Sequence, residues 1–122
     1  MTAGGEAFGD FDIYQELALR TASPESLINS INLLNNAALG LAGESGEIAD
    51  HVKKVVFHGH PLDDATRDKL AKEIGDILWY CAMCARGLGL GLGDIAAMNI
   101  DKLRKRYPEG FSTENSLNRP HG

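Results

Sequence analysis

Apolar residues recur at helical spacing along two long stretches of the chain, separated by the break His58-Gly59-His60-Pro61. Side chains three, four and seven residues apart share one face of an α-helix, so each stretch predicts an amphipathic helix. The stripe of the first is Leu34, Leu41, Ile48, Val52 and Val55, and that of the second is Leu70, Ile77, Cys81, Cys84 and Leu88. Because the break is short, we expect the two helices to pack antiparallel.

The break marks the end of the first long helix, near Phe57, and the start of the second, at a cap on Asp63 or Asp64. The second long helix ends near Arg86. The start of the first long helix stays open. Ser23-Pro24 looks like an N-cap followed by proline, but residues 26–36 are polar enough to form a loop or a separate turn.

A shorter helix is predicted on each side of this pair. The earlier one covers about residues 10–22, and the later one begins at a cap on Asp94 and ends at Tyr107. No convincing strand alternation and no internal repeat occur. We therefore predict an all-α fold, a four-helix bundle in a single domain spanning residues 1–122. Its core covers about residues 8–108, and a polar, extended tail covers residues 109–122.

The charge balance bears on partners. With 17 acidic against 12 basic residues, the 122-residue chain carries a formal charge of −5, which disfavours nucleic acid as a partner. No apolar run is long enough to cross a bilayer, and residues 1–5 lack the features of a signal segment. We therefore expect no membrane partner and a cytoplasmic protein. A chain this short buries more apolar surface when it associates, which favours a homo-oligomer.

Cys81 and Cys84 form a C-x-x-C pair inside an apolar helical run. Zinc needs more ligands than these two, and a redox pair usually opens a helix after a strand. We interpret them as small packed side chains.

Acidic residues stand in pairs at the edges of both stripes: Glu44 with Glu47, and Glu73 with Asp76. The members of each pair are one helical turn apart on one face, so antiparallel packing can bring the two pairs together. Taken alone, each of these four acids is more often an ordinary solvated helix residue than a metal ligand. Four carboxylates at one place repel, and Mg²⁺ offsets this repulsion while keeping positions for water and phosphate. The repeated pair predicts a Mg²⁺ site, with Mn²⁺ as a substitute.

Three motifs in this order resemble the MazG-like nucleotide pyrophosphohydrolases of the all-α pyrophosphatase superfamily. They are GLAGESGEIAD at 40–50, KEIGDILWY at 72–80 and NIDKLRKRYP at 99–108. The resemblance covers about residues 39–108. It implies a four-helix core in a dimer or tetramer and magnesium-dependent hydrolysis of a (deoxy)nucleoside triphosphate to the monophosphate and pyrophosphate, with nucleotide-pool cleansing as one role. Glu44, Glu47, Glu73 and Asp76 match the family's metal ligands position by position.

One position departs from the family. Many members carry a further Glu directly before the first acid, where this chain has Gly43. The number of metal ions and the general base are therefore left open, with Glu47 our choice for the base because it lies further from the stripe. Two alternatives remain: a phosphoribosyl-ATP pyrophosphohydrolase, which shares the acids, and a non-catalytic helical oligomerisation module, which has no need of them.

Countercharge for the phosphates is predicted on the last helix. Asn99, Lys102 and Arg106 share one face there, although a solvated basic face near a helix C-terminus is the simpler interpretation. Lys54 and Tyr80 are further candidates for substrate binding, and His51 shares the flank of Glu44 and Glu47.

Two predictions concern the remaining aromatic residues. Phe8, Phe11 and Tyr14 have no role at the phosphates, so we expect the first helix and the region before Leu39 to shape the base pocket. Trp79 points away from Tyr80 and lies opposite the apolar stripe of its helix, so we expect it at or near a subunit contact.

Overall fold

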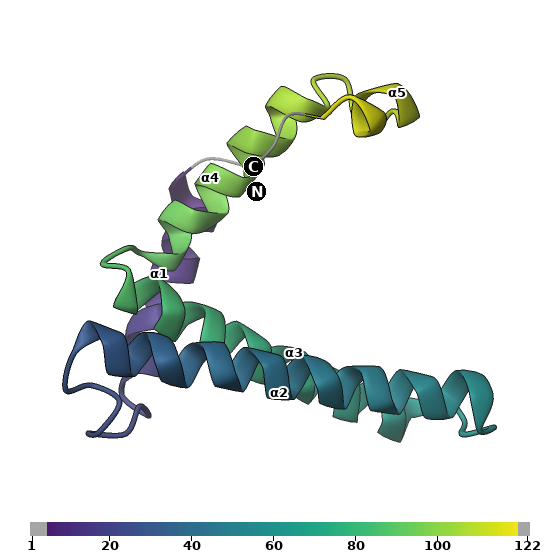
Figure 1. Ribbon diagram of the computed structural model, residues 1–122, viewed down its shortest axis with the longest axis horizontal. Coiled ribbons are helices and arrows are strands. Elements are labelled where there is room, and N and C mark those ends of the chain that lie inside the picture. Colours follow the sequence, from purple (N-terminus) through teal and green to yellow (C-terminus); the bar gives the residue numbers. More distant parts are fainter. Residues whose placement is uncertain (1–4, 120–122) are drawn as a thin grey trace.

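The protein is all-α, as the sequence predicts. The computed structural model describes residues 5–119, with side chains from Gly9 onward, and no strand occurs among these residues. Its helices are α1 (Gly5–Leu19), α2 (Ser30–Phe57), α3 (Asp64–Gly87), α4 (Leu92–Arg106) and α5 (Thr113–Leu117). Figure 1 shows α2 and α3 as a long hairpin, with α1 crossing at one end and α4 projecting away from it.

The α2–α3 hairpin has the predicted ends. Asn29 caps α2, its Oδ1 accepting the backbone N–H of Asn32 at 2.8 Å, and α2 ends at Phe57. Asp63 caps α3 in the same way, accepting the N–H of Thr66 at 2.9 Å. Both caps satisfy amide groups that the first turn of a helix leaves without a partner. Residues 20–29 form turns, which settles the open start of α2.

Helix α1 begins and ends earlier than the expected span of about residues 10–22. Three other predicted boundaries were also wrong. Ser23 caps only a turn, accepting the N–H of Ser26 at 3.2 Å. The N-cap of α4 is Gly91, three residues before the expected cap at Asp94, and Asp94 lies inside the first turn, accepting the N–H of Gly91 at 3.1 Å. The tail is not fully extended, because Ser112 caps the short helix α5. Each of these three differences arises from a local side chain to backbone bond that apolar periodicity does not register.

The core is small and lies where α1, α2 and α3 meet. Its buried apolar residues are Ala18, Leu33, Ala37, Ala82, Met83, Ala85 and Leu92. Small side chains bring the helices close together, and Gly40 of α2 lies directly against the ring of Tyr80, where a Cβ atom would overlap the ring. Of the residues in the two predicted stripes, Cys81 and Cys84 pack against this core. Leu41, Ile48, Leu70 and Ile77 are half-buried, and Val52 is 44% exposed.

Gln15 of α1 connects three segments from a buried position. Its side-chain amide donates to the carbonyl oxygens of Ala82 at 3.0 Å and Leu90 at 3.2 Å, and its Oε1 accepts the N–H of Leu92 at 3.1 Å. In addition, Oδ1 of Asp12 accepts a hydrogen bond from the N–H of Gly93 at 2.8 Å. These side chains bond to groups at the start of α4, so α1 determines how α4 leaves α3.

The turn between α3 and α4 sends α4 away from the hairpin. Gly89 in this turn has φ 74°, a conformation that glycine adopts without steric cost. The axes of α3 and α4 then differ by 98°. The outer half of α4 is therefore remote from the middle of the α2–α3 hairpin, as Figure 1 shows.

Within residues 5–119, no single helix is long and apolar enough to cross a membrane. Helices α3 and α4 meet the criteria of length and composition only as a pair, across their 98° bend.

Replacing Gln15 with Met tests the contribution of its network. The substitution keeps most of the side-chain volume but leaves the carbonyl groups of Ala82 and Leu90 and the N–H of Leu92 without these bonds. We expect the free energy of unfolding in denaturant to fall by about 2–4 kcal/mol. The control is Glu16→Met at the exposed neighbouring position, whose ion pair with Arg86 contributes at most about 1 kcal/mol. Equal effects of the two substitutions would contradict this role for Gln15.

Candidate metal centre and substrate site

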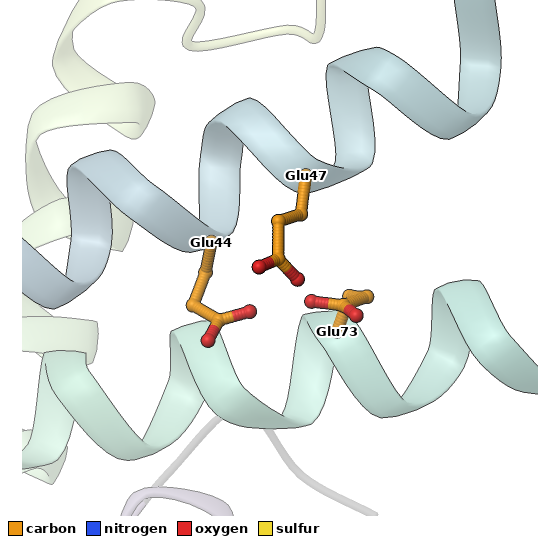
Figure 2. Close-up of side chains that lie close together, drawn as sticks. All are labelled: Glu44, Glu47 and Glu73. Carbon is orange, nitrogen blue, oxygen red and sulfur yellow. The ribbon is translucent and has the colours of Figure 1, made fainter.

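Three of the four predicted acids meet in the seam between α2 and α3. Glu44 and Glu47 point from α2 toward Glu73 on α3, as Figure 2 shows. One carboxylate oxygen from each lies within 4.8 Å of the others. Glu44 and Glu73 are half-buried, whereas Glu47 is exposed. The i, i+3 spacing on α2 and the antiparallel packing of α3 produce this convergence.

The two half-buried acids each hold an oxygen that lacks a partner. Oε2 of Glu44 and Oε2 of Glu73 are shielded from solvent and accept no hydrogen bond from any residue that the structure describes. Burying an ionised oxygen without a donor or cation is unfavourable. A hard divalent cation bound by carboxylate oxygens would remove this deficit, so the residues present fit such an ion.

The electrostatics of the seam show the same crowding. The pKa of Glu73 is raised, first by a side-chain hydrogen bond with Glu44 and then by burial. The pKa of Glu47 is raised, first by a side-chain hydrogen bond with Glu73 and then by the negative charge of Glu73. The charge of Asp76 raises both values further. The acids of the seam therefore oppose one another's ionisation.

Asp76 lies beside the cluster, outside the group of three converging oxygens. It is exposed one turn along α3 from Glu73, and with Glu44 it lines a hollow of about 430 Å³. The other residues that line this hollow are Thr21, Trp79 and Tyr80. Asp76 and the predicted substrate residue Tyr80 thus border the same space, next to the three glutamates.

Trp79 is half-buried and hydrogen-bonds to its own chain. Its Nε1 donates to Oγ1 of Thr21 at 2.8 Å and to the carbonyl oxygen of Ala18 at 3.2 Å. These bonds come from the end of α1 and the turn after it, so Trp79 packs on its own chain. Its position at or near a subunit contact stays a prediction. Its ring meets that of Tyr80 edge-on, with centroids 5.1 Å apart, so the two rings do not point apart as predicted.

The predicted cations on α4 are not brought to the glutamates within one chain. At the helical rise per residue, Asp76 lies about 16 Å from the C-terminal end of α3. Lys102 lies about 15 Å from the start of α4 on the same basis. With the axes at 98°, these positions are roughly 20 Å apart, too far for a lysine side chain to span. Asn99 and Lys102 are exposed on α4, and Arg106 is half-buried, its guanidinium 5.9 Å from the ring centre of Tyr107.

Lys54 and His51, both considered for the site, lie further along α2 than Glu47. Lys54 pairs with Asp50 at 2.8 Å, and Lys53 pairs with the same carboxylate at 3.2 Å. These lysines lower the pKa of Asp50 to about 2. His51 is half-buried one turn from Glu47, and its positive charge counteracts part of the rise in the pKa of Glu47.

The aromatic residues of α1 line a second, smaller space. Phe11 and Tyr14, with Asp10 and Leu78, surround a pocket of about 230 Å³, and the side chain of Phe8 lies outside the described residues. The pKa of Tyr14 is raised by burial and then by the charge of Asp76. Helix α1 therefore does approach the acidic site.

Sequence reasoning missed Thr21, which lies in the turn after α1 and lines the hollow beside Asp76. No periodicity or motif marks a single threonine in a turn.

Cys81 and Cys84 are free thiols, both half-buried at the edge of the core. Burial and the neighbouring Cys84 raise the pKa of the Cys81 thiol. They pack as the sequence suggests.

Comparison with known proteins identifies the family. The MazG nucleotide pyrophosphohydrolase domain matches residues 34–111, more than half of the chain, including all four acids. The chain belongs to the MazG nucleotide pyrophosphohydrolase family. It is also similar to the Gene 37 protein of Mycobacterium phage L5, with 36% identity over 111 residues, covering 88% of this chain and 97% of the phage protein. No solved structure matches the chain.

Membership of the MazG family supports an activity of the nucleotide pyrophosphohydrolase kind. The family depends on divalent metal, and the seam of this MazG domain carries a glutamate cluster able to hold a metal ion. Its substrate is a nucleotide. The family match and the converging carboxylates point to the same part of the chain.

The raised pKa of Glu47 predicts how the metal-free protein responds to pH. An acid whose pKa is higher in the folded state stabilises that state below its ordinary pKa of 4.5, and this stabilisation is lost as pH rises through the raised value. The unfolding free energy of Glu47→Gln, measured in chelator, should therefore depend less steeply on pH above 4.5 than that of the wild type.

Asp50→Asn is the matched control on the same helix. The pKa of Asp50 is lowered from 3.8 to about 2, so its stabilisation is present above pH 3.8 and lost as pH falls toward 2. This variant should keep the wild-type slope above pH 4.5. A Glu47→Gln slope equal to that of the wild type would contradict the crowding inferred at the seam.

Proposed function

We propose that the protein hydrolyses a (deoxy)nucleoside triphosphate to the nucleoside monophosphate and pyrophosphate, using Mg²⁺ held by Glu44, Glu47, Glu73 and Asp76. The observation that carries this proposal is the convergence of three glutamate oxygens within 4.8 Å, two of the glutamates having a shielded oxygen without a partner. The family match supports it. An oligomerisation module would gain nothing from this unfavourable arrangement.

Each acid has a distinct position in the proposed reaction. Mg²⁺ bound here would neutralise phosphate charge and lower the pKa of a coordinated water. Glu44 and Glu73, half-buried in the seam, serve as its ligands. Glu47 is the exposed member of the three glutamates, so an oxygen that does not bind the metal can reach a water molecule, and we assign it as general base as well as ligand. The water oxygen bonds to the α-phosphorus and its proton passes to Glu47. The bond from the α-phosphorus to the oxygen that bridges to the β-phosphate breaks, and pyrophosphate leaves with the bonding electrons.

Countercharge for the leaving pyrophosphate must come from outside the single chain's α4. Asn99 and Lys102 lie roughly 20 Å from the acids of their own chain at the helical rise and bend angle above. We therefore propose a homo-oligomer, a dimer or tetramer, in which α4 of a second copy brings these side chains to the site. Lys54, already paired with Asp50, and Arg106 remain weaker candidates for phosphate binding.

An apolar surface supports association. Helical spacing places the flank residues of α2 and α3 on one side of the hairpin, and we call them the hairpin flank: Leu41, Ile48, Val52, Leu70, Ile74 and Ile77. Ile74 is 60% exposed and Val52 is 44% exposed, and the other four are half-buried. A contiguous apolar patch of this kind marks an interaction surface. A second copy that covers it would also complete the four-helix bundle around the acids.

The single substitutions Glu44→Gln, Glu47→Gln, Glu73→Gln and Asp76→Asn test the metal site. Each removes an anionic ligand while keeping its shape, so pyrophosphate release with Mg²⁺ should fall by about two orders of magnitude or more, beyond the effect typical of groups that only support a ligand. Metal-free stability should stay level or rise, because repulsion is relieved, while the rise in melting temperature on adding Mg²⁺ should shrink.

The control is Asp68→Asn, an exposed acid on α3 paired with Lys72 at 3.0 Å, which should leave activity and the Mg²⁺ response unchanged. A panel of canonical and oxidised nucleoside triphosphates with phosphoribosyl-ATP identifies the substrate class. Release of phosphate without pyrophosphate, turnover of phosphoribosyl-ATP alone, or near-full activity of Asp76→Asn would refute the proposal.

Mixed oligomers test the contribution of α4 from a second copy. Glu44→Gln and Lys102→Ala should each be inactive alone, but co-expressed chains should recover roughly a quarter of wild-type activity, since half of randomly formed dimers contain one intact site. Lys105→Ala is the control, because Lys105 pairs with Asp101 at 3.1 Å on the same helix, and it should keep full activity. A monomer by light scattering at micromolar concentration, or no recovery on mixing, would exclude a shared site.

A further inference from the structure

Aromatic and acidic side chains both line the hollow beside the glutamates. Trp79 and Tyr80, whose rings meet edge-on at 89°, line it together with Glu44 and Asp76. Thr21, from the turn after α1, completes the lining. Its volume of about 430 Å³ lies within the usual range for small-molecule sites. The space therefore adjoins the proposed metal centre and shares Glu44 and Asp76 with it, while Thr21, Trp79 and Tyr80 belong to the hollow alone.

The hydroxyl group of Thr21 has a restricted hydrogen-bonding capacity. A threonine hydroxyl offers one donor and two acceptor positions. Its donor bonds to the carbonyl oxygen of Ala18 at 2.7 Å, and one acceptor position is used by Nε1 of Trp79 at 2.8 Å. One acceptor position remains, and no donor. Any ligand group that hydrogen-bonds to this oxygen must therefore bring its own N–H or O–H.

The charged residues of the hollow make the same demand. The oxygens of Glu44 and Asp76 that do not bind the metal are hydrogen-bond acceptors. A planar ring carrying N–H groups can stack on the aromatic side chains of the hollow and donate to these acceptors, whereas a phosphate group carries no such donor. These properties suit the nucleoside part of a nucleotide better than its phosphates, which belong at the neighbouring glutamate cluster.

We propose that this hollow binds the nucleoside portion of the substrate and that Thr21 is a specificity-determining residue, accepting a hydrogen bond from a donor group of the nucleoside. The donor is a base N–H or the 3′-hydroxyl of the sugar. This inference rests on the proposed function, and it adds a recognition site to which the sequence motifs do not extend. Trp79 takes part indirectly, because its indole N–H occupies one acceptor position and fixes the direction of the other.

The test compares Thr21→Val with Thr21→Ser in the full-length protein. Valine matches threonine in shape but cannot accept a hydrogen bond, whereas serine keeps the hydroxyl. Trp79 retains the carbonyl oxygen of Ala18 as a partner in both variants. For the best nucleoside triphosphate of the panel, kcat/KM should fall about tenfold or more in Thr21→Val and change little in Thr21→Ser, the usual consequence of losing a hydrogen bond built for a substrate donor.

The corresponding 2′,3′-dideoxynucleotide identifies the donor. If the loss in Thr21→Val disappears with this substrate, the 3′-hydroxyl is the donor, and if it persists, the donor is a base N–H. In the latter case the loss must differ among bases, since their N–H groups differ in position. Both results support the inference, because a merely structural role of Thr21 would not make the loss depend on the substrate.

Two controls separate the possible failures. The rise in melting temperature on adding Mg²⁺ should be the same in the wild type and Thr21→Val, because Thr21 is not among the converging oxygens. Unchanged kcat/KM in Thr21→Val, or an equal loss on every substrate including the dideoxynucleotide, would overturn this inference while leaving pyrophosphate release intact. Absence of pyrophosphate release by the wild type from any triphosphate would instead refute the proposed function.

Discussion

The close antiparallel packing of α2 against α3 is the constraint on which the rest of the structure depends. It is tight because small residues of α2 lie in the seam, with Ala37 fully buried and Gly40 against the ring of Tyr80. The same proximity forces Glu44 and Glu73 together and shields one oxygen of each from solvent. Packing at one end of the hairpin thus maintains an electrostatically unfavourable arrangement further along. A cation that binds the folded state would reverse this cost.

Helix α1, together with the turn after it, positions two other parts of the structure. Through Gln15 and Asp12 it holds the start of α4, and through Ala18 and Thr21 it holds the indole of Trp79. The first set of bonds fixes the direction in which α4 leaves the hairpin, and the second shapes the hollow beside Asp76. A single element therefore positions the proposed nucleoside site and the helix that carries the proposed countercharge, although it lies before the residues that match the family.

Association with a second copy would account for two features of the single chain. The hairpin flank is apolar and partly exposed, and α4, the helix that carries Asn99 and Lys102, projects away from the hairpin. A partner that covers the flank would add helices to the hairpin, and its α4 would supply positive charge near the seam. Apolar burial would drive association, and the chemistry would then depend on it.

The sequence by itself determined the four long helices, the ends of the hairpin, the family and the convergence of Glu44, Glu47 and Glu73. The helices and their ends follow from helical spacing and capping residues, and the family follows from short motifs, all of which are local properties. The convergence of the acids follows from their spacing together with the short break, which favours antiparallel packing. Tertiary structure alone decided that Trp79 packs on its own chain, that Gln15 and Thr21 matter, and that α4 turns away by 98°. The physical reason is that these outcomes depend on hydrogen bonds between segments about 60 to 80 residues apart, and on a turn whose direction those bonds select. Periodicity along one helix contains no information about either.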